Sequence, residues 1–287
     1  MSFKNIKIYN LLFIIILIIQ TVLLWFHLDS KAVLTAEEAY SYYLANSKSD
    51  YFLSDNGSLK SSLANRWLDG KFFNDYICPD KDNCFNYLNI NKNIIENTCQ
   101  PLYYYFLHTI CSFFPNHFSK WYGLGFNLFL FIITQILLFN VSKKVVKKNR
   151  PAFFICFLYG FSAAAVDNFT YISFIALLTV FCLLLIKVFI KCLEGNFSFI
   201  KFMEIFLMTI IGCLTHYLFL LYLIIILITF IIIKRRDKKL ILCISASAIF
   251  GIICSYLVFP ETADYIISYI YSYGIVSGVN SLIPNVG

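Results

Sequence analysis

Charged residues are scarce in this sequence. They make up 14% of the 287 residues, whereas a soluble domain of this size carries roughly a quarter. Apolar residues make up 60%, and they gather in runs of about twenty, the length that crosses a hydrocarbon core of ~30 Å. Because backbone groups in lipid must pair internally, such runs have to be helices. The composition therefore excludes a soluble domain and predicts an all-α, polytopic transmembrane bundle.

Basic, metal-binding and cleavage motifs are also lacking. The formal net charge is +7, but Lys and Arg stand beside the apolar runs and form no separate basic domain, which argues against a nucleic-acid partner. The cysteine spacing gives no zinc site, and Cys78 and Cys84 could form a short disulfide or remain free thiols. No acidic cluster is dedicated to a metal, so no cofactor is predicted, although a single divalent cation near Glu37 or Glu38 is left open. No small-residue cleavage site follows the first apolar run, so we interpret that run as a retained span.

The apolar runs divide the chain into four parts. These are a cytoplasmic N-terminus and first span (1–28), a large extracytoplasmic loop (29–120), spans two to seven (121–259) and an extracytoplasmic C-terminal segment (260–287). The runs behind this division are Ile8–Leu28, Trp121–Ser142, Pro151–Val166, Phe169–Ile190, Phe202–Ile233 and Leu240–Phe259.

Three local features refine this division. Phe202–Ile233 contains 32 residues, about 48 Å as one helix, and Gly212 with His216 predicts a break into two spans near its middle. Asp167-Asn168 is all that separates two runs and is expected to form a tight outer turn. The aromatic segment between Pro101 and Pro115 is too short to span, and it predicts a helix lying in the membrane interface.

The basic residues predict the orientation. With seven spans, 15 of the 23 Lys and Arg fall on the cytoplasmic side. The other eight all lie in the long first loop, where the positive-inside rule is weak. We therefore expect a multi-pass cell-membrane protein with a cytoplasmic N-terminus.

Polar groups at one membrane depth are candidates for a functional site. Under this topology they gather at the outer face, so any reaction is expected there. The residues are Glu37, Glu38, Gln100, Asp167, Asn168, His216 and Glu261.

Four motifs in register resemble those of GT-C glycosyltransferases. They are TAEEAYSYYLANS, which is similar to an acidic D-E-x-Y-x-Y motif of the first outer loop, and QPLYYYFLHTICSFFP, YISFIALLTVF and LTHYLFLLY. The chain looks most like bacterial homologues of the protein mannosyltransferases and of the lipid A aminoarabinose transferase. The resemblance implies transfer of a sugar from a polyprenyl-phosphate donor, in contact with membrane lipid, to an extracytoplasmic glycan, lipid or protein acceptor.

The resemblance also assigns roles. An acidic residue of the first outer loop acts as general base in this family, which points to Glu37 with Glu38 beside it. The lipid phosphate needs cationic or hydrogen-bonding partners, for which His216 and Arg66 are the candidates. The candidate substrate-binding set is completed by Gln100, Tyr217, Asp167 and Asn168.

Departures from the family pattern keep other interpretations open. Glu37 stands where the family has Asp, Gln100 where it has Pro, and Ser173 where it has Arg. The chain could therefore be an inactive relative that binds lipid-linked sugar or scaffolds a partner. A transporter is a weaker alternative, because neither internal repeats nor polar groups near mid-membrane are evident. Glu37-Glu38 could also be merely solvated, His216 could cap a helix break, Gln100 could be structural, and Asp167-Asn168 could be only a turn.

Overall fold

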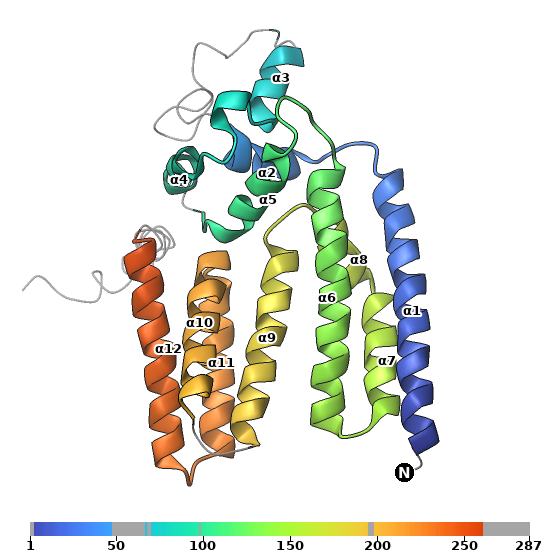
Figure 1. Ribbon diagram of the computed structural model, residues 1–287, viewed down its shortest axis with the longest axis vertical. Coiled ribbons are helices and arrows are strands. Elements are labelled where there is room, and N and C mark those ends of the chain that lie inside the picture. Colours follow the sequence, from blue (N-terminus) through green and yellow to red (C-terminus); the bar gives the residue numbers. More distant parts are fainter. Residues whose placement is uncertain (1–2, 48–66, 68–69, 98, 195–197, 261–287) are drawn as a thin grey trace, which may run out of the picture.

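The computed structural model describes residues 3–47, 67, 70–97, 99–194 and 198–260, which form helices and no strands. In chain order the helices are α1 (Phe3–Ser30), α2 (Ala36–Asn46), α3 (Gly70–Ile77), the 3-10 helix η1 (Lys81–Asn83), α4 (Tyr87–Glu96), α5 (Leu102–Ser112), α6 (Trp121–Val146), α7 (Asn149–Gly160), α8 (Ala163–Thr170), α9 (Ile175–Leu193), α10 (Phe199–Thr215), α11 (Leu218–Ile233) and α12 (Lys238–Val258). The long helices lie side by side, and α2 to α5 form a cap over one end of this bundle (Figure 1). The all-α prediction is confirmed for the described residues.

Several helices have the length and apolarity of membrane spans. Four of the described helices meet both conditions, namely α1, α6, α9 and α12, and α7 with α8 makes a fifth if the bent pair counts as one span. The apolar helix α11 is shorter, with 16 residues, and α10 has 17. This set of helices is compatible with a multi-pass membrane protein.

Basic residues gather at the end of the bundle opposite the cap. The N-terminus and the α6–α7 and α11–α12 connections lie at that end (Figure 1). Lys143 and Lys144 occupy the last turn of α6, and Lys191 occupies the last turn of α9. The structure therefore separates a basic end from a capped end, as the charge pattern predicts.

The predicted break inside 202–233 is confirmed. Helix α10 ends at Thr215, and the backbone N–H of His216 donates to the Gly212 carbonyl at 3.2 Å. A Cβ at Gly212 would collide with the Phe219 ring. Gly212 therefore lets α11 fold back closely on α10.

The predicted outer turn at Asp167-Asn168 is wrong, because both residues lie inside α8. The helix break comes earlier, where α7 and α8 meet at a bend of 59°. Ser162 caps α8 by accepting the Ala165 N–H at 3.2 Å. The Asn168 side chain is accommodated in the helix because its amide donates to the Thr179 hydroxyl at 3.1 Å.

Two buried glutamines stabilise this break. A helix end leaves its last carbonyls without backbone partners, which is costly in lipid. The Gln20 amide of α1 donates to the carbonyl of Phe157, one of the last four in α7, at 3.2 Å and to that of Cys156 at 3.3 Å. Gln135 of α6 donates to the same Cys156 carbonyl at 3.4 Å. Polar side chains thus do lie midway along the bundle, contrary to the sequence-based expectation.

Small residues on α12 allow α10 to pack closely. Ser247, Gly251 and Ser255 are buried and four residues apart, the spacing that lets helix backbones approach in membranes. The Ser247 hydroxyl donates to the Phe202 carbonyl at 2.6 Å. A Cβ added at Gly251 would lie 2.7 Å from Cβ of Thr209 and 3.0 Å from a backbone oxygen of α10.

We therefore expect Gly251→Ala to destabilise the protein by about 1–3 kcal/mol, the usual cost of overpacking. Thermal unfolding of the purified chain in detergent measures this effect. Gly125→Ala in α6 is the matched control, because a Cβ there meets nothing within 4 Å. Equal stability of the two variants would contradict close packing of α10 on α12.

Candidate functional site

Helix α2 holds the acidic pair in a fixed position. Thr35 caps it: its hydroxyl accepts the Glu38 N–H at 3.3 Å, and the Glu38 carboxylate accepts the Thr35 N–H at 2.9 Å. This reciprocal capping box follows from the Thr-x-x-Glu sequence. Tyr42 and Tyr43 of the same helix are fully buried in the apolar core that joins the cap to α6 and α9. The first turn of α2 is therefore held rigidly against the bundle.

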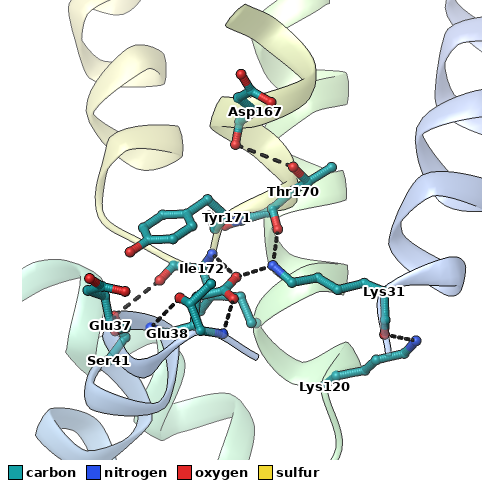
Figure 2. Close-up of polar contacts among 12 residues, drawn as sticks. Lys31, Glu37, Glu38, Ser41, Lys120, Asp167, Thr170, Tyr171 and Ile172 are labelled. Atoms are coloured by element: carbon teal, nitrogen blue, oxygen red, sulfur yellow. Dashed lines mark hydrogen bonds and ion pairs between the residues drawn. The ribbon is translucent and has the colours of Figure 1, made fainter. Parts of the chain in front are cut away.

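Glu38 is the centre of a buried polar network at this junction (Figure 2). Its side chain is fully buried and forms an ion pair with Lys31. Its Oε1 also accepts the Ile172 N–H at 2.9 Å, and Lys31 in turn donates to the Thr170 carbonyl at 2.9 Å. A buried carboxylate needs such partners. With both oxygens engaged, Glu38 fastens the end of α1 and the start of α2 to the α8–α9 connection.

Glu37 differs from its neighbour because its side chain is exposed. Figure 2 shows its carboxylate turned away from the Glu38 network. Its backbone carbonyl accepts the Ser41 hydroxyl at 3.1 Å, and that hydroxyl also contacts the Ile172 carbonyl. Tyr171 lies beside it; its pKa is raised mainly by burial, with the Glu37 and Glu38 carboxylates adding to the effect. Of the two predicted acids, Glu37 is the one with a carboxylate open to an incoming group.

A second group of predicted residues surrounds a small cavity of about 100 Å³ beneath the cap. The structure brings Gln100, His216 and Tyr217 together here. The full lining consists of Asn97, Cys99, Gln100, Tyr104, Phe174, Thr215, His216 and Tyr217. We call this cavity the His216 pocket.

His216 is held as a neutral hydrogen-bond donor. Its ring stacks on Phe174, with centroids 3.8 Å apart and an interplanar angle of 5°. The Leu218 N–H points at Nδ1 from 3.2 Å, so Nδ1 is the acceptor and the ring proton sits on Nε2. Burial lowers the pKa of His216 to about 4. Gln100 is 4% exposed, and its Nε2 finds no hydrogen-bond partner among the described residues, so two N–H donors line one pocket.

This arrangement predicts a specific pH dependence of stability. Because the folded-state pKa of about 4 lies below the ordinary 6.5, the unfolded chain binds a proton at His216 that the folded chain does not. Stability should fall as the pH drops from 6.5 towards 4, by at most about 1.4 kcal/mol per pH unit from this residue. His216→Phe keeps the ring stack and should remove that part of the slope. Unfolding curves of both proteins across this pH range test the assignment, and an unchanged slope in the variant would contradict it.

The remaining predicted residues lie elsewhere. Asp167 and Asn168 line a separate cavity of about 420 Å³ together with Lys31, Thr170, Tyr171 and Ile175. This cavity shares no lining residue with the His216 pocket. Arg66 and Glu261 lie outside the described residues.

The α8–α9 connection links the two sites. Ile172 binds Glu38, and Phe174 stacks on His216. Tyr171 and Phe174 are three residues apart, so their Cα atoms are separated by at most about 11 Å. The exposed Glu37 carboxylate lies near the Tyr171 end of this short segment and the His216 pocket at its Phe174 end, and Glu37 does not line that pocket.

Two structural facts bear on metals and thiols. Within the described ranges, no three His, Cys, Asp or Glu side chains are grouped so that they could hold a metal ion. Cys78 and Cys84, for which a disulfide was one alternative, are both free. The Cys84 thiol donates to the Asp80 carbonyl at 3.2 Å instead.

Sequence reasoning missed Lys31 and Lys120. Lys31 neutralises Glu38, and Lys120 donates to the Lys31 carbonyl at 2.8 Å (Figure 2). Lys120 also donates to the Asp29 carbonyl at 2.6 Å. The available signal was position: Lys31 follows the apolar run Ile8–Leu28 by three residues, and Lys120 directly precedes the run Trp121–Ser142. A cation near the ends of membrane helices can bind the carbonyls of a helix C-terminus, as Lys120 does at the end of α1.

Comparison of the chain with protein-family models, curated proteins and solved structures found no match.

Proposed function

We propose that the protein is an integral membrane glycosyltransferase of the GT-C type. It transfers a sugar from a polyprenyl-phosphate donor to an extracytoplasmic glycan, lipid or protein acceptor. The observation that carries the proposal is the contrast between two adjacent acids: Glu38 is fully buried and paired, whereas Glu37 presents an exposed carboxylate at the junction of cap and bundle.

The proposed topology has seven spans, formed by α1, α6, the α7–α8 pair, α9, α10, α11 and α12. The basic end of the bundle faces the cytoplasm, in keeping with the positive-inside rule. The cap then lies outside the cytoplasm, and its α5 (Leu102–Ser112) lies over the membrane interface. A lipid-linked donor keeps its phosphate at this depth, so a catalyst acting on it needs its polar groups there.

Glu37, His216 and Gln100 have separate roles in the proposed reaction. Glu37 takes the proton of the acceptor hydroxyl as general base. The acceptor oxygen then bonds to the anomeric carbon of the sugar while the bond from that carbon to the phosphate oxygen breaks. The N–H groups of His216 and Gln100 donate to the departing phosphate, and charge developing there is stabilised best by donors already in place. Tyr217 lines the same pocket, and Arg66 stays a predicted phosphate contact.

A screen of polyprenyl-phosphate sugars with the purified chain tests this function. The expected result is consumption of one donor with release of polyprenyl phosphate when an acceptor is present. Boiled protein and the Glu37→Gln variant serve as controls. No donor consumption across the panel, despite measurable donor binding, would exclude the enzyme and select the second candidate.

That second candidate is an inactive relative that binds lipid-linked sugar. It is favoured by Ser173, which stands where the family pattern has Arg, is 7% exposed and accepts the Ile175 N–H at 3.4 Å. Among the described residues lining the His216 pocket, none is Lys or Arg. Among the described residues, phosphate stabilisation there would rest on neutral donors, which is weaker than stabilisation by ionised ones.

A further inference from the structure

A large apolar groove opens at the junction of cap and bundle, on a side that the proposed reaction does not use. Its volume is about 670 Å³, and it lies between the α1–α2 connection, α2, α3 and the residues just before α6. Apolar side chains such as Val33, Phe72, Phe73 and Phe118 form most of the lining. Two cationic residues, Lys31 and Lys120, line it, and none of the described lining residues is acidic.

The groove lies where two membrane-spanning helices end. Helix α1 ends at Ser30 and α6 begins at Trp121, and the groove residues Lys31 and Lys120 directly adjoin those positions. Trp25 and Trp121 stack on each other with centroids 6.2 Å apart, and Trp25 is 41% exposed. Because tryptophan prefers the membrane–water interface, this pair places the groove at the level of lipid headgroups.

The groove is separate from the Glu37 carboxylate. Ala36 and Ala39 line it, and successive residues of a helix are rotated by about 100°. Glu37 therefore points about 100° away from Ala36 and about 160° away from Ala39. The groove is therefore independent of the proposed sugar transfer.

One of the two charges at the groove has no carboxylate partner among the described residues. The Lys31 ammonium is paired with Glu38. The Lys120 ammonium contacts the Asp29 and Lys31 carbonyls and lies 5.9 Å from the Trp121 ring centroid, and no ion pair joins it to a described carboxylate. A cation beside an apolar channel at headgroup depth matches an amphiphile with an anionic head.

We infer that this groove binds an anionic membrane lipid, with its anionic headgroup at Lys120 and apolar groups of the lipid against Val33, Phe72 and Phe118. A free anion would satisfy Lys120 but leave the apolar lining uncovered. A neutral lipid would cover the lining but leave the lysine without a counterion. An anionic lipid does both.

Quenching of Trp121 by brominated lipid tests the inference. The full chain carrying Trp25→Phe and Trp67→Phe keeps Trp121 as its single tryptophan. It is reconstituted in phosphatidylcholine vesicles that contain a minor fraction of brominated phosphatidylglycerol, or the same fraction of brominated phosphatidylcholine. We expect phosphatidylglycerol to associate about fivefold more strongly, the preference that one lysine near an anionic headgroup supplies.

Three variants make the result specific. Lys120→Gln should abolish the preference, whereas Lys71→Gln on exposed α3, outside the groove lining, should keep it. Ala39→Leu fills the groove without changing charge and should reduce quenching by the anionic lipid. Equal quenching by both lipids in the parent protein, or an unchanged preference in Lys120→Gln, would overturn the proposal. Displacement of the lipid by inorganic phosphate would also overturn it, because the headgroup alone would then suffice.

Discussion

Glu37→Gln is expected to lower sugar transfer by about 10²–10⁴-fold, the range that general-base catalysis contributes. The amide has nearly the same shape as the carboxylate but cannot take the acceptor proton. Because the Glu37 side chain is exposed, its replacement removes no buried contact. The measurement is donor consumption at saturating acceptor, alongside thermal unfolding of the same preparation.

The control for this variant is its stability. Substitutions of exposed residues that make no buried contacts usually change the free energy of unfolding by no more than about 0.5 kcal/mol. Glu37→Gln should therefore unfold at nearly the same temperature as the parent protein. Glu37→Asp keeps a carboxylate on a shorter side chain and should retain part of the activity. Full turnover by Glu37→Gln would remove this residue from the reaction.

Lys31→Met is expected to destabilise the protein by about 3–5 kcal/mol, the cost of leaving a buried carboxylate without its cation. The Glu38 carboxylate would keep the hydrogen bonds from Thr35 and Ile172 but lose its counterion. Lys31 would also no longer hold the Thr170 carbonyl. Denaturant or thermal unfolding in detergent measures the loss.

A double variant separates the charge effect from lost packing. Lys31→Met combined with Glu38→Gln removes both charges, while Gln at this position can still complete the capping box. It should recover a substantial part of the stability lost in Lys31→Met. Lys71→Met, an exposed lysine of α3, should leave stability unchanged. A double variant no more stable than Lys31→Met would show that the buried charge is not the cause.

Sequence signals predicted a helix break well where the residues that form the break are neighbours in the chain. The polar Thr215-His216 pair after Gly212 marks the α10–α11 break, and the glycine leaves room for the Phe219 ring of α11. The Thr35-x-x-Glu38 capping box fixes the start of α2 in the same local way, although no helix was predicted there. Apolar runs predict spans because their length is set by the bilayer.

Features that depend on distant partners were not predictable in this way. The bend between α7 and α8 needs Gln20 and Gln135, which come from two other helices. The Lys31–Glu38 pair was hidden because position alone does not show which carboxylate a lysine meets. For the candidate site, the sequence placed Gln100 and His216 at one membrane depth, and the structure brings them into one pocket.

The bent pair of helices has a consequence for the surrounding bilayer. With 12 residues, α7 rises only about 18 Å, well short of a hydrocarbon layer of ~30 Å. Beyond it α8 departs at 59° and carries Asp167 and Asn168. Beside this short helix the bilayer must become locally thinner, or polar groups must lie deeper in it. An amphiphile approaching from this side would meet a shallower apolar barrier than beside the four helices that are long enough to span, namely α1, α6, α9 and α12.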